Sequence, residues 1–286
     1  MRHAVLAIGL TVALAAGSAR TAHAQRLCRP TSDSHEAQLL AALAVPLAYG
    51  TVEAPAVPVP GAVRVALEVT YLPDVDEVIR TATQCRPGKG PEHTDPLFAF
   101  PRPRVMVGLP AGLLVEASWI PPVRLNGVQS HLVGLSVARG FVLGGRGSRL
   151  TLRAHSTLGR IRAAITCPDE ELENTQSECF EGTRSDDRYH PTTFGAEGVL
   201  GWSLGEGRLR PFVGAGLNLL RPRFQVNFTD RFGTLDDTRV EVNLARGALF
   251  AGATWTVARG LGLSGEIYGA PGDAVTGRLL VSFALR

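Results

Sequence analysis

The sequence predicts an all-β fold: an antiparallel, up-and-down transmembrane β-barrel of about ten strands with a short N-terminal helix. Three observations support this fold class. The chain begins with an export segment, continues through about ten segments of alternating polarity, and ends on one more such segment. In the last segment, 274–286, apolar residues occupy one parity, and strands show this period when one face meets an apolar medium. These apolar residues are Leu279, Val281, Phe283 and Leu285.

The first 24 residues predict a secretory signal peptide. The charged start Arg2-His3 precedes an apolar run over 4–16, and an Ala-x-Ala site ends at Ala24. The run is shorter than the roughly 20 apolar residues that a membrane-spanning helix needs. We therefore expect cleavage after Ala24 and a mature protein outside the cytoplasm.

The charge balance of the chain excludes one class of partner. Removing the signal peptide leaves 27 basic and 26 acidic residues, a net charge of +1. A nucleic-acid partner would require a basic footprint, so we expect none. After the signal peptide no stretch is apolar for long enough to span a membrane as a helix, so membrane residence would depend on strands.

The segment 25–61 predicts a short helix followed by a stiff spacer. Asp33 can cap a helix that continues to Val45, and Pro46 should end it. Four leucines fall on one stripe of this helix at spacings of three and four: Leu39, Leu40, Leu43 and Leu47. Three prolines make the following stretch extended and semi-rigid: Pro55, Pro58 and Pro60.

The position of this helix has two alternatives. The spacer is long enough for the helix to plug the barrel lumen. A leucine stripe, however, matches poorly with a lumen of arginine and glutamate. We therefore expect docking at the periplasmic rim or the membrane interface, with Cys28 and Cys85 apart. A bond between these cysteines would instead require the N-terminal segment to thread the lumen.

From residue 62 to the end, ten segments alternate between apolar and polar or small residues, as half-buried strands do. They are 62–71, 104–109, 113–119, 133–137, 149–153, 193–204, 209–217, 240–257, 261–268 and 274–286. Short connections alternate with mostly longer ones, the asymmetry expected between periplasmic turns and external loops. Ten strands that start in the periplasm would leave both chain ends on one side.

The seventh and eighth strands each change apolar parity once. The changes lie near Arg221-Pro222 and near 245–247, and these two sites face each other in a hairpin. A one-residue slip of this kind is typical of a β-bulge. The strands also exceed the 9–11 residues that a membrane crossing needs, so the hairpin should project above the membrane.

Two motifs resemble a known class. The closing strand with its near-terminal aromatic, Phe283, resembles the last strand of bacterial outer-membrane β-barrels. The string over 209–217, LRPFVGAGL, resembles a strand common in small barrels of the outer membrane protein A-like type. The resemblance covers little of the chain and identifies no specific family. It implies residence in the bacterial outer membrane and recognition of the last strand by the barrel-assembly machinery.

The inward parity of the predicted strands carries the candidate functional residues. A barrel of this strand number has a lumen that side chains largely fill. Charges there can form a structural ion-pair network or line a narrow permeation path. These lumen charges are Arg64, Glu68, Arg104, Glu116, Arg149, Arg153, Glu197, Arg210, Glu266 and Arg278.

The long loop 162–192 contains Cys167 and Cys179, which we expect to form a disulfide in an oxidising compartment. The same loop is acidic, but its spacing matches no EF-hand. We expect no metal and no cofactor. Carboxylates and a histidine could imitate the rim residues of omptin-type proteases, although they form no recognisable motif: Asp186, Asp187, His190, Asp236 and Asp237.

We therefore expect a monomeric, integral outer-membrane barrel of structural or narrow-pore, small-solute type, without a catalytic motif. Its expected partners are outer-membrane lipid and the assembly machinery. Two alternatives remain: an outer-membrane barrel enzyme, omptin-like or lipid-modifying, and a soluble periplasmic β-barrel or sandwich that binds a ligand.

Overall fold

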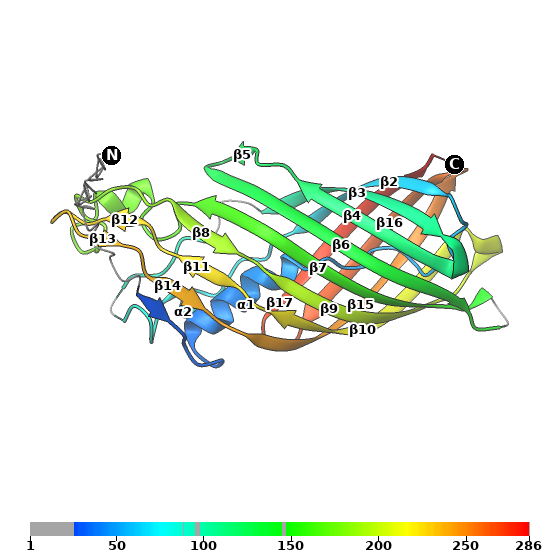
Figure 1. Cartoon of the computed structure of the whole chain (residues 1–286), viewed down its shortest axis with the longest axis horizontal. Helices are drawn as coiled ribbons and strands as arrows, with labels where there is room; N and C mark the ends of the chain where they lie inside the picture. The colour runs from blue at the N-terminus through cyan, green and yellow to red at the C-terminus, as the bar shows by residue number, and fades with distance from the viewer. Residues whose placement is uncertain (1–25, 88, 95–97, 145–146, 286) are drawn as a thin grey trace, which may run out of the picture.

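The computed structural model describes residues 26–87, 89–94, 98–144 and 147–285. The expected signal peptide therefore lies outside the described residues. Ten long strands form an antiparallel barrel in chain order (Figure 1). They are β2 (Val63–Tyr71), β3 (Ala99–Leu109), β4 (Leu113–Ile120), β6 (Val128–Val142), β7 (Arg149–Ala163), β9 (Thr193–Gly201), β10 (Leu209–Leu220), β15 (Leu244–Ala258), β16 (Leu261–Ala270) and β17 (Ala274–Ala284).

The barrel closes between its first and last strands. In this ladder Val69 of β2 lies opposite Leu279 of β17, and Arg64 lies opposite Ala284. Closure satisfies the backbone hydrogen bonds that an open edge would leave unpaired. The up-and-down barrel of ten strands that the alternation predicts is confirmed.

The two faces of the wall have the polarity of a membrane-spanning barrel. On β17, Leu279 is 61% exposed on the outside, whereas Arg278 and Ser282 are buried inside. The soluble alternative requires the reverse, with apolar side chains inside and polar ones in water. In the described part of the chain no helix is long and apolar enough to cross a membrane.

The two ends of the barrel differ. At the turn end, strands are joined by tight connections such as η1 (Pro110–Gly112) and η4 (Gly205–Gly207). At the opposite, loop end, short strands continue the wall in the order β7, β8, β11, β14, β1. These are β8 (Asp187–His190), β11 (Arg223–Gln225), β14 (Arg239–Glu241) and β1 (Leu27–Cys28).

Smaller elements complete this loop-end extension. They are helix α2 (Glu77–Arg80), the 3-10 turn η3 (Asp169–Leu172), strand β5 (Arg124–Leu125), and the hairpin of β12 (Phe228–Thr229) and β13 (Leu235–Asp236).

The predicted β-bulge in the seventh and eighth strands is wrong. The register from Leu209↔Trp255 to Leu220↔Leu244 continues unchanged into Arg223↔Glu241. Even-numbered residues of β10 and β11 therefore face inward throughout. What changes is the chemistry of the two faces, because beyond Leu220 the inner face becomes apolar and the outer face becomes polar. The hairpin extends past the barrel, as expected (Figure 1).

Helix α1 (His35–Leu47) is capped by Ser34, whose hydroxyl accepts from the Ala37 N–H at 3.1 Å, and not by Asp33. Pro46 lies inside its last turn. The helix is buried on nearly all sides inside the loop end, and Tyr189 of β8 donates to its Leu40 carbonyl at 2.9 Å. The expected docking at the periplasmic rim or the membrane interface is therefore wrong.

Residues 48–60 then run through the lumen to the turn end. There the Gly61 N–H donates to the Gly108 carbonyl at 2.9 Å, immediately before β2 begins. At the loop end Cys28 is bonded to Cys85, so the expectation that these cysteines stay apart is also wrong. Because the described chain starts at the loop end and finishes at the turn end, its two ends do not share one side as expected.

Candidate functional site

The lumen contains a girdle of alternating charges on neighbouring strands. Glu68 of β2 contacts Arg104 of β3, and Arg102 lies 4.0 Å from the same carboxylate. Arg104 in turn lies 3.7 Å from Glu116 of β4. All four groups are buried. The sequence prediction omitted Arg102, because the predicted strand began only at residue 104, whereas β3 begins at Ala99.

The girdle continues on the other side of β6. Arg153 of β7 contacts Glu116 and lies 3.3 Å from Glu197 of β9. On β16 and β17, Glu266 and Arg278 pair at 3.3 Å with no exposed side-chain surface. Each buried charge thus has a partner of opposite sign, which is the condition for holding charges out of water.

The remaining three predicted charges lie nearer the turn end. Arg64 pairs with Glu53 of the lumen segment, and Arg210 interacts electrostatically with Arg64, Arg149 and Glu53. All three arginines are only partly buried. The structure therefore divides the predicted set into seven residues in the girdle and an arginine-rich mouth formed by Arg64, Arg149 and Arg210.

Tyr49 occupies the centre of the girdle. Its ring centroid lies 4.2 Å from the guanidinium carbon of Arg104 and 5.0 Å from that of Arg153. Cation–π attraction is strongest where water is excluded, and this ring is fully buried. Tyr49 lies between the predicted helix and the proline-rich spacer, outside any helical or strand periodicity. The sequence pattern therefore gives no reason to place it in the girdle.

The wall also binds the backbone of the lumen segment. Carbonyl oxygens at the helix exit accept from arginine: Leu47 from Arg102 at 2.9 Å, and Ala48 from Arg278 at 3.0 Å. Farther along, the Val52 N–H donates to Glu266 at 3.1 Å. The charges of the wall therefore bond simultaneously to one another and to the segment.

The Thr51 hydroxyl donates to Glu197 at 2.5 Å and accepts from Arg153 at 2.8 Å. The Ala54 N–H donates to Thr254 at 2.8 Å. These contacts extend the bonding of the segment to β7, β9 and β15. Unpaired backbone groups in a buried position would cost free energy, and the wall supplies their partners.

Gly134 of β6 makes room for the Tyr49 ring. An added Cβ would lie 2.6 Å from Tyr49 Cδ2 and 2.5 Å from Ser118 Oγ. We expect Gly134→Ala to reduce the free energy of unfolding by about 1–3 kcal/mol, the usual cost of overpacking. Urea titration of the folded protein in lipid vesicles measures this. Gly277→Ala is the matched control, because its Cβ meets nothing within 4 Å. Equal stability of both variants would contradict the close packing of the Tyr49 ring against Gly134.

A cavity of about 230 Å³ lies beside the lumen segment in the turn-side half of the barrel. Its lining includes residues 53–59 of the segment together with Arg64, Glu116 and Arg153 of the wall. At the loop end a second, mainly apolar cavity of about 120 Å³ separates α1 from β7 and β3. The segment therefore fills the lumen without filling all of its cross-section.

The loop end is fastened to the N-terminal segment near the Cys28–Cys85 bond. Glu36 of α1 accepts from the backbone N–H groups of Gln84 and Cys85, both at 2.7 Å. Burial alone would raise the pKa of Glu36, but these bonds bring its pKa below the usual value. In a capping box this carboxylate would accept from a backbone N–H at the start of its own helix. Here it accepts from backbone N–H groups of the loop instead.

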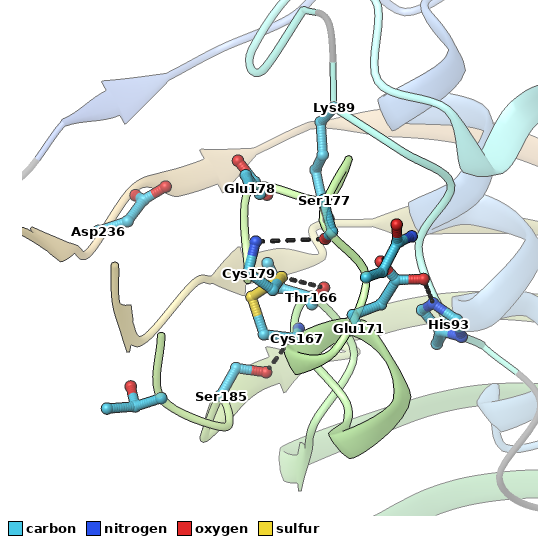
Figure 2. The surroundings of a disulfide bond; sticks show 12 residues. Lys89, His93, Thr166, Cys167, Glu171, Ser177, Glu178, Cys179, Ser185 and Asp236 are labelled. Atoms are coloured by element: carbon cyan, nitrogen blue, oxygen red, sulfur yellow. Dashed lines mark hydrogen bonds and ion pairs between the residues drawn. A yellow bond between two sulfur atoms is a disulfide. The ribbon is translucent and has the colours of Figure 1, made fainter. Parts of the chain in front are cut away.

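Cys167 and Cys179 are bonded to each other, and Figure 2 displays their surroundings. The Cys167 N–H donates to Ser185 Oγ at 3.0 Å, and Cys179 Sγ lies 3.4 Å from the Thr166 carbonyl oxygen. Asp187 is buried nearby and accepts from the Thr166 N–H at 2.6 Å. Burial raises the pKa of Asp187. This half of the loop is therefore tied to β8.

The carboxylates and histidine compared with omptin-type rims do not converge. Asp187 faces inward, whereas His190 faces outward and its Nδ1 bonds to the Gly159 carbonyl at 3.0 Å. Asp236 pairs with Arg86 at 3.0 Å. Across the residues that the structure describes, no three potential metal ligands cluster.

Neither a protein-family model nor a curated protein matches the sequence. Among solved structures, the chain is similar to the attachment invasion locus protein Ail of Yersinia pestis. The sequence identity is 9%, the match covers 79% of this chain and 98% of that chain, and the TM-score is 0.27.

The chain is also similar to the outer membrane protein Omp33 of Acinetobacter baumannii, at 9% identity over 78% of this chain and 97% of that chain, with a TM-score of 0.30. It is similar as well to the toluene transporter TodX of Pseudomonas putida, at 9% identity over 80% of this chain and 68% of that chain, with a TM-score of 0.31. At such TM-scores the likeness assigns neither a family nor a function to this chain.

Proposed function

We propose that this chain is an integral outer-membrane protein whose barrel is sealed by its own N-terminal segment. Its role is then structural: it forms a closed wall in the membrane and carries an ordered, disulfide-fastened extension at the loop end. The passage of residues 48–60 through the lumen is the observation that carries this proposal.

The outer-membrane location rests on three supports. The outer face of the wall is apolar over the height of the barrel, as lipid contact requires. The sequence predicts export. The short turns and long loops support an orientation with the turn end in the periplasm and the loop end outside. The closing strand β17, with Phe283 on its outer face, is what we propose the assembly machinery binds.

The sealed state is supported by the number and kind of contacts on the segment. Glu197, Glu266, Arg104 and Arg278 each bond to a backbone or side-chain group of residues 48–54. These wall groups are themselves paired, so withdrawing the segment would remove hydrogen bonds from charged groups, each worth about 1.5–3 kcal/mol.

Small-solute permeation is the second candidate. The 230 Å³ cavity and the arginine-rich mouth at its turn end favour it, because together they form a polar path through the turn-side half of the lumen. Anions would be the solutes such a mouth selects. In this function the segment between Thr51 and Glu53 would have to move aside.

Planar-bilayer recording separates the two functions. We expect the folded wild-type protein to add no steady conductance, and a variant lacking residues 26–58 to raise conductance by an order of magnitude or more, since a water-filled lumen replaces the plug. A difference in mobility between unheated and heated samples on a denaturing gel verifies that each protein is folded.

Steady conductance of the wild type would overturn the sealed state and favour permeation. If the deletion variant does not fold, the Cys28→Ser/Cys85→Ser protein replaces it, with brief openings as the expected result. Recovery of the wild type in the soluble periplasmic fraction would contradict the membrane location itself.

A further inference from the structure

Six arginines occupy three successive outward levels on the outer face of the wall, at the point where the barrel passes into the loop-end extension. Five project from the neighbouring strands β7, β8, β11 and β14, and the sixth, Arg221, directly follows β10; all lie on the parity that faces outward. This arginine row consists of Arg160, Arg162, Arg188, Arg221, Arg223 and Arg239.

The row is poorly neutralised by the protein. Glu241 is its one carboxylate among the described residues, and it lies 2.9 Å from Arg239 and 3.6 Å from Arg223. Arg160, Arg162 and Arg188 form no ion pair within the described chain. The next outward carboxylates, Asp186 and Asp237, lie two residues farther from the barrel than Arg188 and Arg239.

Two of these arginines directly oppose each other. Arg162 of β7 is the register partner of Arg188 of β8. Like charges at such positions destabilise a sheet. This repulsion is offset if an anion with several acceptor oxygens bridges the two guanidinium groups.

The level of the row is defined by what lies below it. On β7 and β10 the outward residue next nearer the barrel centre is apolar: Leu158 lies below Arg160, and Leu219 lies below Arg221. On β8 and β14 the corresponding residues are polar, His190 and Glu241. The Arg221 guanidinium lies 6.0 Å from the ring centroid of Phe194. The row is therefore where lipid tails would end and headgroups would begin.

We propose that the arginine row binds the phosphate groups of an anionic glycolipid in the outer leaflet. The inference rests on the proposed outer-membrane orientation, which puts the loop end outside. Guanidinium groups bind phosphate oxygens in pairs, and arginines on successive levels suit a headgroup that carries more than one phosphate. The apolar wall beneath the row receives the acyl chains of the same molecule.

Lipid retention by the full mature protein tests this proposal. The protein is folded into nanodiscs of a neutral, phosphate-free lipid and titrated with diphosphorylated lipid A. The triple variant R160Q/R162Q/R188Q removes the three unpaired charges without leaving a carboxylate alone. The matched control R139Q/R208Q/R259Q removes three exposed arginines at the turn end.

We expect the apparent dissociation constant to rise about tenfold or more in the row variant and to stay near the wild-type value in the control, because charged hydrogen bonds to phosphate are lost only in the former. High salt should weaken binding by the wild type. Dephosphorylated lipid A should bind weakly to every protein.

Equal retention by the row variant, or equal binding of the dephosphorylated lipid, would overturn the proposal. Tighter binding of a soluble polyphosphate than of lipid A would reassign the row to a soluble partner and also overturn it. If the triple variant does not fold, R160Q and R188Q are measured singly, with about threefold weakening expected of each. A folded, membrane-inserted wild type that retains no lipid would refute this inference while leaving the sealed barrel intact.

Discussion

Replacing Arg104 with methionine is expected to reduce the free energy of unfolding by about 3–5 kcal/mol, the cost of breaking a buried ion pair from one side. Arg104 contacts Glu68, lies 3.7 Å from Glu116 and donates to the Gly50 carbonyl at 3.0 Å. The substitution would leave Glu68 with Arg102, at 4.0 Å, as its ion-pair partner and with the Thr70 hydroxyl as a hydrogen-bond donor. Urea titration of the vesicle-inserted protein measures the change.

Arg208→Met is the control for this experiment, because Arg208 is exposed at a turn and should change stability by no more than about 0.5 kcal/mol. Adding Glu68→Gln to Arg104→Met should recover part of the loss, since the orphaned charge is removed. If Arg104→Met proved as stable as Arg208→Met, the girdle would not be a buried network.

Replacing Val213 with arginine is expected to destabilise the inserted barrel by about 2–4 kcal/mol, the cost of a cation on the lipid face near the bilayer midplane. Val213 lies opposite Ala251, is 45% exposed on the outside and sits in the middle of β10. The folded fraction, read from heat-dependent mobility on a denaturing gel, should fall accordingly.

Asn243→Arg is the matched control, because Asn243 is exposed between β14 and β15, beyond the apolar height of the barrel. It should assemble as the wild type does. Similar losses in both variants would mean that the outer face does not meet lipid at Val213, and the membrane-spanning assignment would fail.

The strands and their facing could be predicted from the sequence because alternation is a local property. The parity of Leu279, Val281 and Phe283 defines the outer face without knowledge of any neighbour. Most of the girdle could be predicted for the same reason. Charged residues on the opposite parity must face inward, and closure of the barrel places those on adjacent strands side by side.

The course of the N-terminal segment could not be predicted, since it depends on contacts far apart in the sequence. The leucine stripe of α1 matches poorly with a charged lumen, and this mismatch predicts docking outside the barrel. The helix instead lies in the loop-end extension, where Tyr189, Phe224 and Val240 turn an apolar face inward. The charged lumen holds the segment after the helix, whose peptide groups bond well to arginine and glutamate.

The same extension explains the misjudged bulge. An apolar residue marks the outer face where lipid surrounds the wall, but it marks the inner face where the wall encloses α1. Leu219 and Phe224 thus sit on opposite parities of one unbroken ladder. A change in surroundings imitates a slip in register when only the sequence is read.

The threaded segment changes the count of crossings. With ten wall strands and one lumen passage, the described chain traverses the barrel an odd number of times. Arg26 therefore lies beside β14 at the loop end, whereas Leu285 lies beside Val63 at the turn end. In a membrane, Arg26 and Leu285 would therefore face different compartments, so each side of the bilayer would have access to only one of these two residues.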